Sequence, residues 1–434
     1  MRARGEVSRI ALPILLAMIP DSIISLVSMT TASRVGTEAV AGTGLASYLF
    51  FIMNAVASIF MVGLLVVASQ AYGGGNMKLV ERALGESITA SLTLALAVML
   101  SSSVWLTPYV EVLSGGQAEV GGVALTYLNL RMLSLPALML NTVIATAYRA
   151  VEKPWPSTYS SLSVGVAGSL LIPSLTLGLA GLPALGVSGM GLASATSQYV
   201  GLGVYLFFRL PVRIRPYIPS RTLLKVLAIG IPASVERVVG SVGQNIYINA
   251  VARSGVEALA AHNIGLSVEN LVINPVFAVG VAASAKVGHR VGSNSIKDLD
   301  YLTRESLRIG ISWMSIATAV LVILSPFVGS FFTSEPEVSR LVTVYLVLAA
   351  ISEVGLGASQ ALYGVFRGLG STWVPLMISS FTVLILRAFL AQALQPLHGI
   401  YGVWFTQITD MYGRLAISYI TYSRLRTRLV IKVV

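Results

Sequence analysis

Residues 252–267 read ARSGVEALAAHNIGLS, and residues 33–48 read SRVGTEAVAGTGLASY. The two stretches lie 219 positions apart and carry small and apolar residues in the same order. The same spacing pairs Pro13 with Pro232, Gly73 with Gly292, Lys78 with Lys297 and Glu86 with Glu305. At a spacing of 218 the matching residues are Tyr127 and Tyr345, Arg149 and Arg367, and Trp155 and Trp373. The chain is therefore an internal duplication.

The composition is typical of a membrane protein. Of the 434 residues, 55% are hydrophobic and only 11% are charged, and the mean hydropathy is +0.81. Soluble domains carry about 25% charged residues. The 40 glycines lie largely within apolar runs, where small residues let helices pack closely in lipid. The strands of an outer-membrane barrel would alternate apolar and polar residues instead. We therefore predict a helical integral membrane protein.

Apolar windows of about 20 residues, long enough to cross a bilayer as a helix, occur twelve times. They predict an all-α integral membrane protein with twelve transmembrane helices in two pseudo-symmetric six-helix lobes. The lobes are residues 1–208 and 222–434, joined by a cytoplasmic linker at 209–221 that contains four arginines. Six spans in each half make both halves enter the membrane in the same direction, as in many transporters. The predicted spans are residues 10–32, 42–69, 87–106, 120–147, 157–179, 184–208, 222–250, 258–286, 306–331, 338–366, 373–395 and 398–422.

The net charge of +11 follows the topology of these spans. If both termini lie on one side, that side carries 22 of the 29 Lys and Arg residues, with those at its span ends included. The other side carries only Arg34, Arg253 and Arg340, and four lie within the spans. By the positive-inside rule both termini are predicted to be cytoplasmic, in a multi-pass protein of the cell membrane. Basic residues lie in short clusters between apolar runs, so nucleic acid is not a predicted partner.

Carboxylates inside the predicted spans are concentrated in the second half. Glu269 aligns with Phe50, Glu236 with Ala17 and Glu353 with Leu135. Only Asp21, opposite Gly240, and Arg131 reverse this trend among the charged residues. Counted along their helices, the four second-half acids lie roughly 15–25 Å deep, so we predict that they converge on one chamber and couple transport to a cation. These residues are Glu236, Glu269, Glu353 and Asp410.

The predicted span 258–286 has one polar side. Asn263, Asn270 and Asn274 recur at i, i+7 and i+11, next to a stripe of His262 and Glu269. This side is expected to face a cavity, and Pro275 is expected to free the Leu271 carbonyl for an ion. His262 is expected to be a satisfied group near the membrane interface rather than a proton relay. The predicted substrate-binding residues are Asp21, Asn263, Asn270, Asn274, Gln360 and Arg387.

Structural roles compete with these assignments. Arg237, Arg387 and the Asp410/Arg414 pair at i, i+4 suit charge neutralisation between helices as well as ligand contact. Glu236 and Glu269 are assigned to function, because intramembrane carboxylates are seldom present without a partner or a pathway. The three histidines have no metal-ligand spacing. The chain has no cysteine, which excludes disulfides and thiol catalysis.

The run from Glu257 to Ser295 resembles the multidrug and toxic compound extrusion (MATE) transporters, as do its first-half echo and the stretch FRGLGSTWVPLMIS at 366–379. The resemblance covers nearly the whole chain. It implies a twelve-helix, two-lobe exporter whose central cavity opens alternately to each side. It further implies efflux of organic cations driven by inward Na⁺ or H⁺.

The resemblance also assigns individual residues. Glu269 matches the acidic position of helix 8, Glu236 is the match for an acid in helix 7, and both would be metal ligands if Na⁺ is the coupling ion. The first lobe departs from the pattern, because the acid usual in helix 1 falls at Ser28 and the polar pair usual in helix 5 falls at Gly168 and Ile172. The family's Asp after helix 10 is Ser371 here.

The predicted function is secondary active antiport that exports small amphipathic organic cations in exchange for Na⁺ or H⁺. A carboxylate in a low-dielectric chamber can be neutralised by a proton, a metal ion or a cationic drug, and exclusive occupancy couples their fluxes. The alternative is a lipid-linked oligosaccharide or lipid flippase of the same superfamily. An enzyme is not predicted, because paired Asp motifs and metal constellations are missing from the sequence. We expect a monomer with no cofactor besides the coupling ion.

Overall fold

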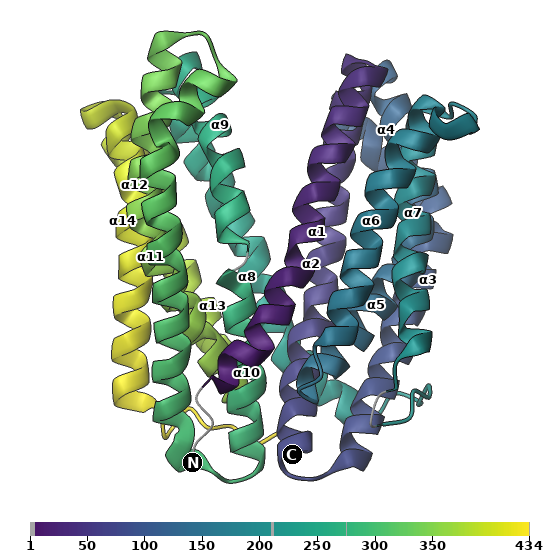
Figure 1. Cartoon of the computed structure of the whole chain (residues 1–434), viewed down its shortest axis with the longest axis vertical. Coiled ribbons are helices and arrows are strands. Elements are labelled where there is room, and N and C mark those ends of the chain that lie inside the picture. The colour runs from purple at the N-terminus through teal and green to yellow at the C-terminus, as the bar shows by residue number, and fades with distance from the viewer. Residues whose placement is uncertain (1–4, 210–211, 275, 434) are drawn as a thin grey trace. The chain divides into compact units, whose positions relative to one another are not determined.

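The computed structural model describes residues 5–209, 212–274 and 276–433, which are helices joined by short connections (Figure 1). These residues form no strand. The predicted all-α class is therefore confirmed. Helices are the expected solution for such apolar windows, because a helix satisfies its backbone hydrogen bonds internally where no water is available.

The first half forms six helical segments within residues 5–209, one for each predicted span. One segment is composite: a short 3₁₀ turn, η1, joins α4 to α5, and Pro136 stands in the first turn of α5, where its missing amide hydrogen costs little. The elements are α1 (Glu6–Val35), α2 (Thr37–Gly73), α3 (Met77–Ser114), α4 (Ala118–Arg131), η1 (Met132–Ser134), α5 (Leu135–Ala150), α6 (Trp155–Leu177), η2 (Leu179–Gly181), α7 (Gly186–Val204) and η3 (Tyr205–Phe207).

The second half also forms six helical segments within its described residues. The predicted span 258–286 is filled by α9 and α10, and Pro275, predicted to free a carbonyl oxygen, lies outside the described residues. The positive φ of Gly399 (58°) divides α14 between the last two predicted spans. The elements are α8 (Arg221–Ala252), α9 (Val256–Ile273), α10 (Val276–Gly292), η4 (Ile296–Asp298), α11 (Leu299–Phe332), α12 (Pro336–Gly368), α13 (Trp373–Phe381), η5 (Thr382–Phe389) and α14 (Leu390–Leu425).

Eight helical stretches of the described chain are long and apolar enough to cross a membrane. One of them, Trp373–Leu425, contains the last two predicted spans. The helices at the predicted spans 184–208, 222–250 and 258–286 are not among these eight.

The helices divide into two compact units. We call residues 16–72 and 76–230 the N-unit, and residues 1–15, 73–75 and 231–434 the C-unit. The units differ from the predicted lobes at two helix starts, because the beginning of α1 belongs to the C-unit and the beginning of α8 belongs to the N-unit.

Glycines make the start of α8 fit closely against α2 within the N-unit. A Cβ atom on Gly63 of α2 would lie 2.0 Å from the carbonyl oxygen of Val226 in α8. Conversely, a Cβ atom on Gly230 of α8 would lie 2.0 Å from the carbonyl oxygen of Ile59 in α2. Only glycine permits this backbone approach, which replaces side-chain packing by direct contact between helices.

A pair of glutamates related by the duplication holds the two helix starts. Glu86 of α3 is fully buried and accepts hydrogen bonds from the backbone amides of Ser220 (3.0 Å) and Leu223 (2.7 Å) at the start of α8. Its counterpart Glu305 of α11 accepts one from the backbone amide of Val7 at the start of α1 (3.3 Å). The first turn of a helix has unsatisfied N–H groups, and a carboxylate both satisfies them and complements the helix dipole.

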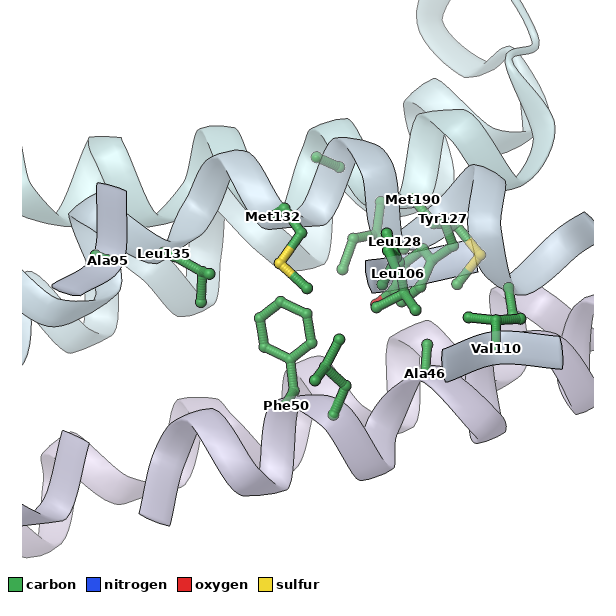
Figure 2. Packing of buried hydrophobic residues seen from close by; sticks show 14 of the residues in the cluster. Ala46, Phe50, Ala95, Leu106, Val110, Tyr127, Leu128, Met132, Leu135 and Met190 are labelled. Atoms are coloured by element: carbon green, nitrogen blue, oxygen red, sulfur yellow. The ribbon is translucent and has the colours of Figure 1, made fainter. Parts of the chain in front are cut away.

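Each unit has its own apolar core. In the N-unit, Phe50 of α2 packs with Met132 and Leu135, which lie at the junction of α4 and α5 (Figure 2). In the C-unit, the core contains Tyr345 of α12 and Trp404 of α14, whose ring centroids are 5.3 Å apart in an edge-to-face arrangement. These two cores border the polar sites described next.

Candidate functional site

Glu269 of α9 is buried in the C-unit with only 2% of its surface exposed. The hydroxyl of Tyr345 donates a hydrogen bond to one carboxylate oxygen, and the side-chain amide of Gln407 donates to the other (2.6 Å). No Lys or Arg within the described chain forms an ion pair with Glu269. Its direct hydrogen-bond donors are therefore both neutral, which is an incomplete compensation in a low-dielectric interior.

Glycine sets the position of the tyrosine that holds Glu269. A Cβ atom on Gly265 of α9 would lie 2.1 Å from the ring of Tyr345. The close approach of α12 to α9 brings the tyrosine hydroxyl to the carboxylate, which lies four residues, about one helical turn, beyond Gly265.

Glu353 of α12 adds a second carboxyl group to this site. It is fully buried, and neither of its oxygens has a well-aligned hydrogen-bond donor among the described residues. Glu269 lies close enough to interact with it electrostatically, as do Arg387 and Arg414. Two carboxyl groups that share a buried site repel each other when both are ionised.

Asp410 of α14 is the third buried acid and lies between two arginines. One nitrogen of Arg414 contacts both carboxylate oxygens, at 3.0 and 3.1 Å. Arg387, on the π-helical stretch η5, lies 3.9 Å from the same carboxylate and also donates to the side-chain oxygen of Gln407 (3.3 Å). Gln407 therefore links the Glu269 carboxylate to the Arg387 guanidinium.

The charges of this C-unit cluster do not cancel. When fully ionised, Glu269, Glu353 and Asp410 carry three negative charges, whereas Arg387 and Arg414 carry two positive charges. A net charge in a membrane interior is costly. One proton or one monovalent cation would restore neutrality.

Donor chemistry favours such a light ion over a transition metal. No group of three or more His, Cys, Asp or Glu side chains that could hold a metal occurs in the described chain. Carboxylate and hydroxyl oxygens suit hard cations instead, and the oxygens of Glu353 are the unpaired acceptors of this site. The residues present therefore fit either a proton or Na⁺.

Glu236, which was predicted to couple transport with the other three acids, has a separate partner. Two hydrogen bonds, of 2.8 and 3.1 Å, join its carboxylate to Arg367 of α12. Both side chains are partly accessible. The structure thus brings Glu269, Glu353 and Asp410 together and places Glu236 in a neighbouring ion pair.

The two polar stripes of α9 differ in their burial. His262 and Glu269 are buried, whereas Asn263 and Asn270 are exposed. The expectation of a satisfied interfacial His262 was wrong: it is fully buried, and neither ring nitrogen has a hydrogen-bond partner among the described residues. Its ring packs edge-to-face on Tyr345, with centroids 4.9 Å apart. Adjacent helical residues differ by about 100° in direction, which separates the two stripes.

The remaining predicted substrate residues are dispersed. Arg387 joins the C-unit cluster, Gln360 is buried in α12, and Asn274 follows the end of α9. Asp21 lies in the N-unit, where it lines a cavity of about 610 Å³. Their substrate contacts stay predictions.

The N-unit cavity holds one acid and one base. Asp21 of α1 and Arg131 of α4 both line it. No ion pair joins these two side chains. The other lining residues are mainly apolar or hydroxyl-bearing and include Ser25, Ser28, Ser47, Asn54, Met190 and Gln198.

Tyr345 and Gln407 were missed in the sequence. A signal for Tyr345 was available, because its duplicated partner is Tyr127, and both prove to hold a charged side chain. Gln407 carried no comparable signal, since its role depends on the break in α14 that brings it beside α9.

A family model, MatE, matches the chain twice, over residues 13–174 and 232–392. The two matches start 219 positions apart, which is the spacing of the internal duplication. The chain belongs to the MatE family. The predicted resemblance to MATE transporters is thereby confirmed.

MATE relatives match almost the full length of the chain. The probable multidrug resistance protein NorM of Thermotoga maritima is 23% identical over 424 residues, covering 95% of this chain and 90% of the relative. The probable multidrug resistance protein YoeA of Bacillus subtilis is 26% identical over 393 residues, covering 87% and 84%. The solved structure of the Vibrio cholerae MATE transporter VcmN superposes with a TM-score of 0.89 at 18% identity, covering 99% and 98%. The shared MATE fold has twelve transmembrane helices in two lobes.

Proposed function

We propose that this MATE transporter exports small amphipathic organic molecules by secondary active antiport with Na⁺ or H⁺. The observation that carries the proposal is the uncompensated charge of the C-unit cluster, where three buried acids face two arginines. The names of the MATE relatives indicate multidrug resistance as the biological role.

The coupling ion is proposed to bind at Glu269 and Glu353. Asp410 already has two arginine partners, so its charge needs no further cation. Glu269 has only neutral donors, and Glu353 has unpaired oxygens. A proton shared by these two carboxyls, or a Na⁺ between them, would remove their repulsion and neutralise the cluster.

The organic substrate is proposed to bind in the N-unit cavity, with Asp21 facing its cationic group. The ion site and the substrate cavity then belong to different compact units. Coupling therefore acts through conformational states: the ion stabilises one state of the transporter, and the substrate is released from that state because its affinity there is lower.

Purified protein in liposomes tests this antiport directly. With an outward Na⁺ gradient at equal pH, or an outward H⁺ gradient without Na⁺, one gradient is expected to drive accumulation of a fluorescent organic cation in the lumen against its own gradient, because antiport moves the ion and the substrate in opposite directions. Dissipating that gradient with the matching ionophore is expected to stop accumulation. Uptake that ignores both gradients but requires ATP would contradict the proposal.

Both termini and the linker are proposed to be cytoplasmic, as the distribution of Lys and Arg predicts. Because the chain has no cysteine, single cysteines at Ile218 of the linker and at Gln117 between α3 and α4 report the topology; both side chains are exposed. We expect an impermeant maleimide added to intact cells to label Gln117→Cys and to leave Ile218→Cys unlabelled until the cells are opened. The reverse pattern would invert the topology.

A further inference from the structure

Arg131 is the only arginine or lysine that lines the N-unit cavity in the described chain. Its guanidinium carbon lies 3.9 Å above the ring centroid of Phe50 and 5.2 Å from that of Tyr127. The Tyr127 hydroxyl accepts a hydrogen bond from one of its nitrogens. Phe50 and Tyr127 are themselves fixed in the apolar core (Figure 2). Cation–π contact and the hydrogen bond therefore hold the arginine in one place.

The charge of Arg131 has no acidic partner in the described residues. A guanidinium has five N–H donors, and the hydrogen bond to Tyr127 uses one of them. None of its other nitrogens is a buried atom without a hydrogen-bond partner. These nitrogens are therefore accessible from the cavity. A fixed, accessible fork of donors matches the geometry of a carboxylate or phosphate group.

The duplication strengthens this interpretation, because the corresponding regions of the two halves carry charges of opposite sign, at positions where the other half has an uncharged residue. Phe50 corresponds to Glu269, Tyr127 to Tyr345 and Arg131 to Ala349. In the C-unit the tyrosine donates its hydroxyl hydrogen to a carboxylate, whereas in the N-unit the tyrosine accepts from a guanidinium. One scaffold thus forms a site for cations in one half and a site for anions in the other.

Asp21 supplies the second charge of the cavity. Its carboxylate is accessible, and the base that influences it electrostatically is Arg149 rather than Arg131. Asp21 and Arg131 therefore do not neutralise each other, and a ligand in the cavity meets a separate acid and base. Besides Asp21 and Arg131, serine hydroxyls and the side chains of Phe50 and Met190 line this cavity.

We propose that the N-unit cavity binds zwitterionic amphiphiles, with Arg131 binding an anionic group of the substrate and Asp21 its cationic group. This inference rests on the proposed transport function and narrows its substrate class. A purely cationic substrate would leave Arg131 buried beneath it without a counter-charge, which is unfavourable. A zwitterion satisfies both side chains at once.

Two dyes that differ by one methyl group test the proposal. Rhodamine 110 carries a carboxylate beside its cationic ring system, and rhodamine 123 is its methyl ester and lacks the anionic group. Binding to the purified full-length protein is measured for both dyes by equilibrium dialysis. We expect the wild type to bind rhodamine 110 at least as tightly as rhodamine 123. Arg131→Gln is expected to weaken rhodamine 110 binding about tenfold or more, the effect of one charged hydrogen bond. It is not expected to weaken rhodamine 123 binding, because the cationic dye then no longer lies over a positive charge.

Two further variants serve as controls. Arg34→Gln removes a positive charge from the exposed end of α1, outside the cavity, and is expected to leave both affinities unchanged. Arg131→Lys keeps the charge but loses the planar fork, and is expected to retain part of the preference for rhodamine 110. Melting temperatures show whether each variant is folded.

The outcomes separate the inference from the proposed function. Equal losses for both dyes in Arg131→Gln, or tight wild-type binding of rhodamine 123 with rhodamine 110 more than tenfold weaker, would overturn the anionic subsite and leave multidrug transport standing. Binding and gradient-driven transport of neither dye by the wild type would overturn the proposed function, and the subsite with it.

Discussion

Replacing Glu269 by glutamine is expected to abolish the response of efflux to the driving ion gradient while leaving the protein folded. The amide has nearly the shape of the carboxyl group and can still accept the hydrogen bond of the Tyr345 hydroxyl. It also removes the excess negative charge of the cluster, so folding loses no counter-charge. The variant therefore imitates the neutralised state permanently.

The measurement compares gradient-driven and downhill transport in liposomes. We expect Glu269→Gln to bind rhodamine dyes in the N-unit cavity like the wild type and to melt within a few degrees of it, yet to show no accumulation above equilibrium. Glu257→Gln removes an exposed acid from the first turn of the same helix and is the matched control, with coupling expected to be retained. Normal coupling in Glu269→Gln would assign the ion to another residue.

Replacing Asp410 by asparagine is expected to have the opposite profile, with a large loss of stability. The substitution removes the carboxylate that lies between Arg387 and Arg414, both of which are almost inaccessible. Removing one partner of a buried ion pair costs about 3–5 kcal/mol, because the remaining charge stays buried without compensation. We expect a melting temperature in detergent well below that of the wild type and poor recovery of folded protein.

Two companion variants identify the cause of that loss. Glu236→Gln leaves Arg367 without its acidic partner, but Arg367 is more accessible than Arg387 and Arg414. We therefore expect Glu236→Gln to destabilise the protein clearly less than Asp410→Asn does. Adding Arg414→Met to Asp410→Asn removes one of the two arginine charges that lack a partner in the single variant. We expect this second substitution to restore part of the stability, and a double-mutant cycle measures the effect as a coupling energy. If Asp410→Asn melts like the wild type, Asp410 is not a structural counter-ion.

Much of the fold was predictable because the duplication and the apolar windows act over long stretches of sequence. The spacing between Glu86 and Glu305, for example, was visible before the structure, and both prove to hold helix starts. The buried acids Glu269, Glu353 and Asp410 were also found, since a carboxylate in an apolar helix stands out by composition alone.

The partners of those acids were not predictable in the same way. Depth along a helix placed Glu236 with the other acids, but depth does not specify which neighbouring helix a side chain meets. In the structure Glu236 pairs with Arg367, at the end of α12. Similarly, the position of Arg387 depends on the π-helical stretch η5, which no residue pattern in that segment indicated. Tertiary packing decided both pairings.

The two helix-start contacts imply that neither half of the chain is self-sufficient. Glu86, encoded in the first half, satisfies the amides at the beginning of the second half, and Glu305 of the second half does the same for the beginning of the first. A half-length ancestor would have left its own glutamate and its own leading turn unsatisfied. Two copies could have satisfied each other by trading these ends in a closed two-fold dimer. In the present chain each half thus supplies the carboxylate that the first turn of the other half needs, as two subunits with swapped ends would.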